Sequence, residues 1–191
     1  MKRLFIIPVI LSASLLFAGS IYVMEKGGRA AIATTNAKGD KVVGINKNVS
    51  SILRIEQGSF TISIPIKSFD FDDYRLIDHF AGEDYLDANK EPMIFINAKI
   101  PGAADMDFSK LDEKHIELNG ELKIRGITKT HPINITLNGS DEGISGQLSL
   151  SKIELKDFGI EVSEAVEAEL GDGFRMTCAV TWKKIEAPKK K

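Results

Sequence analysis

The sequence predicts an all-β fold of eight or nine strands, mostly in hairpin order. A sandwich would fit, but long consecutive strands with one apolar face favour a closed antiparallel barrel. Two observations carry this prediction. Several segments alternate strictly between apolar and polar residues, and most successive segments are joined by short turns. No internal repeat and no second domain boundary is visible in the 191 residues, which are enough for one domain with a sizeable core.

The clearest alternation occurs in residues 116–137. Ile116, Leu118, Leu122 and Ile124 share one parity, and charged or polar residues occupy the other. A turn follows at residues 126–130, and the alternation then resumes through Leu137. This pattern is typical of a β-hairpin with one buried face.

The other strands are expected on both sides of this hairpin. The final one carries Phe174, Met176, Cys178, Val180 and Trp182 on a single parity. An extended segment is also expected over residues 158–169. The remaining predicted strands cover residues 30–34, 42–49, 52–56, 60–66, 93–100 and 143–155.

Residues 69–92 are acidic, aromatic and irregular. We expect one short helix in the connection around residues 72–88, capped by Asp72 and Asp73, with Leu76 and Phe80 on its apolar side. The seven carboxylates between Asp70 and Asp87 lack the spacing of a calcium-binding loop, so a solvated acidic surface is expected.

The amino-terminal residues have the layout of a secretory signal peptide. Lys2 and Arg3 precede an apolar run, and small residues follow at Ala18 to Ser20. We therefore expect a signal peptide over residues 1–20, a linker over 21–29, the barrel domain over 30–186 and a basic tail over 187–191. This predicts a periplasmic or secreted protein, although the apolar run could also remain as a membrane anchor.

Charge and composition exclude several classes of function. The net charge is −2, so no basic surface for nucleic acid is expected. The three histidines lack metal-ligand spacing, and His115 and His131 are expected to be solvated. No nucleophile elbow, phosphate-binding loop or paired cysteine motif is present. We therefore predict no catalysis, no metal and no cofactor.

Three sequence blocks resemble the YceI-like family of secreted, lipocalin-like polyisoprenoid-binding proteins. They are RLIDHF followed by YLDANKEPMIF at residues 75–95, GELKIRGITK at residues 120–129, and LKDFGI at residues 155–160. In this chain His131-Pro132 stands where the family more usually has an apolar residue. The resemblance implies a lipocalin-like eight-stranded antiparallel β-barrel whose apolar tunnel holds a long prenyl chain.

The resemblance also implies which residues bind the ligand, namely the apolar residues on the inner faces of the strands. The polar head of a prenyl quinone or prenyl phosphate is expected near Arg75 and His79. Alternation alone equally supports a solid core, as in a structural or protein-interaction module. Contact with a membrane surface and a homodimer are left open. The expected lining residues are Phe60, Ile62, Ile64, Phe95, Leu122, Ile124, Ile133, Ile135, Leu148, Met176 and Cys178.

Overall fold

The computed structural model describes residues 21–24 and 27–185. The expected signal peptide over residues 1–20 and the basic tail over 187–191 lie outside these residues. Within the described part no helix is long and apolar enough to cross a membrane.

The described residues form eleven strands that belong to one antiparallel sheet. The strands are β1 (Ile21–Met24), β2 (Arg29–Thr35), β3 (Lys41–Asn46), β4 (Ser50–Arg54), β5 (Ser59–Pro65), β6 (Phe69–Phe71), β7 (Met93–Lys99), β8 (Lys114–Ile124), β9 (Ile127–Ser140), β10 (Gly143–Glu154) and β11 (Gly173–Lys184). The helices are α1 (Leu76–Ala81) and α2 (Glu164–Leu170), with 3-10 turns η1 (Ile66–Ser68), η2 (Ala103–Asp105), η3 (Phe108–Lys110) and η4 (Leu155–Phe158).

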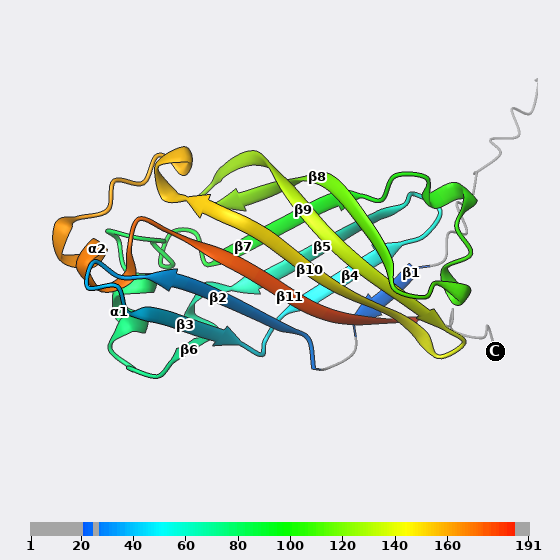
Figure 1. Ribbon diagram of the computed structural model, residues 1–191, viewed down its shortest axis with the longest axis horizontal. Coiled ribbons are helices and arrows are strands. Elements are labelled where there is room, and N and C mark those ends of the chain that lie inside the picture. The colour runs from blue at the N-terminus through cyan, green and yellow to red at the C-terminus, as the bar shows by residue number, and fades with distance from the viewer. Residues whose placement is uncertain (1–20, 25–26, 186–191) are drawn as a thin grey trace, which may run out of the picture.

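Eight of these strands close into a barrel, which confirms the predicted fold class. The hydrogen-bonded order is β1, β4, β5, β7, β8, β9, β10 and β11, and pairing of β1 with β11 closes the ring. The remaining strands β2, β3 and β6 extend the wall beyond β11. Figure 1 shows the long strands crossing obliquely, as closure of a barrel requires.

Closure at β1 corrects one prediction. Residues 21–24 were expected in a linker, but they form β1, with Met24 opposite Trp182 of β11 and Val23 opposite Ile52 of β4. β2 then continues beside β11, with Ala30 opposite Cys178. β1 and β2 therefore act as one interrupted strand along β11.

The helices differ from the prediction in one respect. α1 lies inside the expected range of residues 72–88. The segment 158–169 was expected to be extended, but residues 164–170 form α2, which buries Val166 and Leu170. These two residues are four apart and lie on one helical face, so packing of that face favours the helix. Both helices lie at the same end of the barrel (Figure 1).

The core of the protein is the interior of the barrel, where large side chains pack against glycines, which have no side chain. Trp182 is fully buried, and its ring packs against Gly146 so closely that a Cβ on Gly146 would lie 2.7 Å from the ring. The Trp182 indole Nε1–H donates to Ser51 Oγ at 2.9 Å, and Ser51 Oγ donates to the Thr61 carbonyl at 2.8 Å. The single tryptophan therefore links β11 to β4 near the point where β1 pairs with both strands.

Candidate apolar binding site

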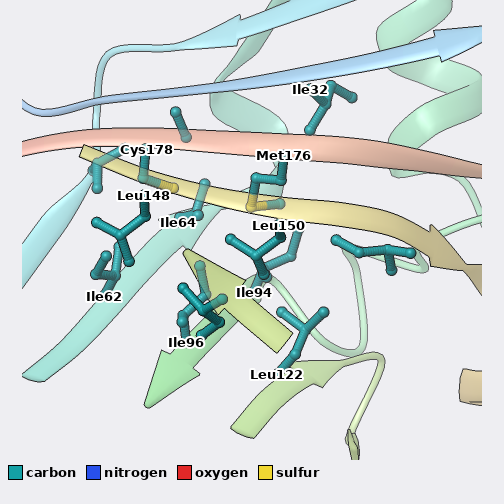
Figure 2. Close-up of a cluster of buried hydrophobic side chains, with 14 of the residues drawn as sticks. Ile32, Ile62, Ile64, Ile94, Ile96, Leu122, Leu148, Leu150, Met176 and Cys178 are labelled. Atoms are coloured by element: carbon teal, nitrogen blue, oxygen red, sulfur yellow. The ribbon is translucent and has the colours of Figure 1, made fainter. Parts of the chain in front are cut away.

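Ten of the eleven residues predicted to line the interior do point into it. Each of the ten has at most 2% of its surface accessible. They come from β5, β8, β9, β10 and β11. Figure 2 shows several of them converging with Ile32, Ile94, Ile96 and Leu150. The ten are Phe60, Ile62, Ile64, Leu122, Ile124, Ile133, Ile135, Leu148, Met176 and Cys178. Their role in ligand binding stays a prediction.

The prediction for Phe95 is wrong. Phe95 lies on the outer face of β7, opposite Ser63 of β5 and Lys123 of β8. The Lys123 ammonium lies 5.9 Å from the centre of the Phe95 ring. The neighbouring Ile94 and Ile96 are fully buried and occupy the interior instead.

Side chains fill the interior in this structure. An eight-stranded barrel is just wide enough to be filled by side chains or to hold one small ligand. The near-zero exposure of the ten lining residues corresponds to the filled case. A shallow hollow lies on the outer surface instead, over β2, β9, β10 and β11, where Asn134, Gln147 and Thr177 line it. A long ligand could therefore enter only if interior side chains rearrange.

A cluster of aromatic rings packs beneath α1 at the helical end. The Phe80 ring lies 5.1 Å from Phe69, 5.3 Å from Phe71, 5.7 Å from Tyr85 and 6.0 Å from Phe174, measured between ring centres. Burial raises the pKa of the Tyr85 phenol, and the nearby Asp172 carboxylate raises it further. The cluster closes this end of the barrel with large apolar side chains, a feature that sequence reasoning did not identify.

A buried carboxylate anchors the loop that follows α1. Asp87 is 4% exposed, and its Oδ2 lies 2.9 Å from the Lys90 ammonium and 3.9 Å from the Arg125 guanidinium. Arg125 belongs to the turn between β8 and β9, so the contact joins that turn to the loop. The buried negative charge is thereby compensated, as burial requires.

Arg75 and His79, the predicted contacts for a polar head, lie on the outside of the helical end. The Arg75 guanidinium binds Asp73 and holds the pKa of that carboxyl at about 2. His79 Nε2 lies 3.3 Å from Glu169 Oε2, and both side chains are about half exposed. The His79–Glu169 pair joins α1 to α2 on the surface, and the Arg75 side chain is exposed. Neither Arg75 nor His79 therefore reaches the interior in this structure.

The expectation that His131 is solvated is wrong for one of its ring nitrogens. His131 is half-buried on β9, and its Nε2 atom is buried without a hydrogen-bond partner among the described residues. It pairs with Gly120 of β8, whose own inward face is buried. His115, in contrast, is exposed, and its Nδ1 lies 2.8 Å from Thr136 Oγ1.

Within the described residues, no group of three or more His, Cys, Asp and Glu side chains is arranged to hold a metal ion. Cys178, the only cysteine, is free and buried. Desolvation raises the pKa of its thiol to about 12.

Cys178 should therefore react very slowly with thiol reagents. We expect modification by a disulfide reagent at pH 8 to be at least a hundredfold slower than for an exposed thiol, because both the thiolate fraction and access are low. The rate should keep rising with pH well above pH 9. A Thr177→Cys, Cys178→Ala variant is the matched control, because residue 177 is exposed on the same strand. Equal rates for the two thiols would show that the interior opens readily.

The fold and site together define a closed antiparallel barrel with an apolar, polar-poor interior and one end covered by helices. The family model for the YceI-like domain matches residues 25–182. The chain therefore belongs to the YceI-like family.

Solved structures share this fold at low sequence identity. A polyisoprenoid-binding domain from Saccharophagus degradans, implicated in plant cell wall breakdown, is 10% identical with a TM-score of 0.69, covering 86% of this chain and 98% of its own. BcnA from Burkholderia cenocepacia is 20% identical with a TM-score of 0.65 and coverages of 83% and 98%. A YceI protein from Campylobacter jejuni is 20% identical with a TM-score of 0.53 and coverages of 75% and 85%. Among curated proteins, none matches the sequence.

Proposed function

We propose that the protein is a non-catalytic carrier that binds an amphiphilic isoprenoid, a prenyl quinone or prenyl phosphate, inside the barrel. Family membership supports the proposal, and so does the similarity in fold to a polyisoprenoid-binding domain. The single structural observation that carries it is the barrel interior, where buried aliphatic side chains from several strands converge (Figure 2). Among the described residues the one buried charged side chain, Asp87, lies in the loop after α1. We further propose that the carrier works in the periplasm or outside the cell.

The energetics of such binding depend on burial of hydrocarbon. Each CH₂ group removed from water contributes about 0.8 kcal/mol, so a chain of several isoprene units has a large driving force. This driving force must exceed the cost of moving interior side chains, because they fill the barrel in this structure. Met176 and the aromatic cluster suit this adjustment, since methionine has several rotatable bonds and aromatic faces accept irregular hydrocarbon.

The filled interior also favours a second candidate function. A barrel whose lining residues are at most 2% exposed is a complete hydrophobic core on its own. The protein would then be a structural or protein-interaction module of the cell envelope. Its partner would bind the outer surface, and no lipid would enter.

Native mass spectrometry of protein purified from its own cell envelope separates the two functions. The carrier should retain a species whose mass varies in isoprene units, and organic extraction should release it and identify its head. Protein that is free of lipid on purification, and that still binds none after incubation with geranylgeranyl phosphate or a prenyl quinone, would support the structural module.

A further inference from the structure

The inner face of β9 changes in character along its length. Alternate residues of a strand share a face, so residues 127, 129, 131, 133 and 135 project to the same side. Ile127 is 40% exposed and Lys129 is exposed, whereas Ile133 and Ile135 are only 1% exposed. His131 stands between the two groups. This face of β9 therefore leads from solvent, past a cation and an imidazole, into the apolar interior.

The hydrogen-bonded wall of the barrel is interrupted beside the same residues. β9 pairs with β10 only as far as Ile133, which lies opposite Leu150. Just beyond this point the pairing of β10 with β11 shifts register between Leu150 and Ile153, an irregularity of the kind that bends a strand, and Pro132 has no N–H to donate. Residues 127–132 of β9 therefore pair with β8 on one side and with no strand on the other, among the described residues. Gly159 lies next to Ile127, at the start of the stretch of β9 that does not pair with β10.

The imidazole at this position carries a polar atom that the protein itself does not satisfy. His131 Nε2 is buried and unpartnered within the described residues. The buried polar residues Asn46, Ser51 and Asp87 each have a partner, in Pro65, Thr61 and Lys90 respectively. Because an unsatisfied buried polar group destabilises the folded protein, its presence here calls for a partner supplied from outside.

We infer that His131 binds the oxygen-bearing head of the isoprenoid, with its prenyl chain running inward past Ile133 and Ile135. This inference rests on the proposed function and assigns the polar end of that ligand. Lys129 is the next residue outward on the same face, so its ammonium would meet the head if that head is a phosphate. The polar contact thus comes from β9, rather than from Arg75 and His79 on the outer surface.

The test compares three probes of equal chain length: geranylgeranyl phosphate, geranylgeraniol and the corresponding headless hydrocarbon. In His131→Leu, affinity for the phosphate and the alcohol should fall about tenfold, because a hydrogen bond to the head is lost. Affinity for the hydrocarbon should stay within twofold. The melting temperature of the lipid-free variant should rise, because leucine removes the unsatisfied nitrogen. His131→Gln should recover part of the affinity for both headed probes.

His115→Leu is the matched control, since His115 is exposed on β8 and should change none of these values. Lys129→Gln should weaken binding of the phosphate alone, and an unchanged phosphate affinity would overturn the role given to Lys129. Equal losses for headed and headless probes in His131→Leu, or no loss for any, would overturn the role of His131 while leaving the proposed function intact. If the wild-type protein binds none of the three probes, the proposed function itself fails.

Discussion

Replacement of Trp182 by alanine should lower the free energy of unfolding by about 3 to 5 kcal/mol. Trp182 is fully buried, packs against Gly146 and lies 6.3 Å from the Phe60 ring. The variant leaves a cavity at the point where β1 pairs with β11, and it removes the donor that satisfies Ser51 Oγ. Urea denaturation followed by far-UV circular dichroism measures the change. Tryptophan fluorescence does not serve here, because the variant loses the protein's single tryptophan.

Two further variants separate packing from hydrogen bonding at this position. Trp182→Phe keeps much of the ring but loses the indole N–H, so it should cost less than Trp182→Ala. Thr181→Ala changes the adjacent exposed residue of β11 and should alter stability by no more than about 0.5 kcal/mol. A loss below about 1 kcal/mol in Trp182→Ala would contradict the view that this residue holds the barrel closed.

Leu122→Ala should lower the stability of the lipid-free protein by about 2 to 5 kcal/mol, yet increase its response to lipid. Leu122 is fully buried on the inner face of β8, opposite Ile96. Its truncation creates apolar space that a prenyl chain can occupy without displacing a side chain. Since a ligand stabilises the folded state according to its concentration and dissociation constant, tighter binding gives a larger rise in melting temperature.

The measurement is the melting temperature with and without geranylgeranyl phosphate, for the wild type and the variant. Lys123→Ala is the control on the outer face of the same strand, where the lost contact with the Phe95 ring is worth about 1 kcal/mol or less. Its response to lipid should equal that of the wild type. A smaller response in Leu122→Ala than in the wild type would place the lipid away from this part of the interior.

The sequence predicts the barrel well because alternation is a local property of each strand. Where alternation fails, so does the prediction. Met93, Ile94, Phe95 and Ile96 form a continuous apolar run, and the run alone does not say which parity faces inward. The parity that faces inward is set by the pairing of Phe95 with Lys123 and Ser63, and these partners lie on strands distant in the sequence.

Other features were missed because they arise from tertiary contacts. β1 has only four residues, and its partner strand β11 lies about 160 residues away, so its role in closure leaves little local signal. α2 is the exception, because the sequence does carry a local helix signal there: Val166 and Leu170 are four residues apart and follow Ser163. Burial of His131 depends on where β9 loses its pairing with β10, which no local pattern reveals.

The central claim is that an isoprenoid occupies the interior of the barrel, and photocrosslinking tests it most directly. The probe is geranylgeranyl phosphate with a diazirine in its prenyl chain, and fragmentation mass spectrometry locates the modified residues. We expect insertion at inward residues such as Leu148, Met176 and Cys178, suppressed by unlabelled lipid. Insertion at the alternating outward residues Ser149, Arg175 and Thr177, or insertion that unlabelled lipid does not suppress, would contradict the claim.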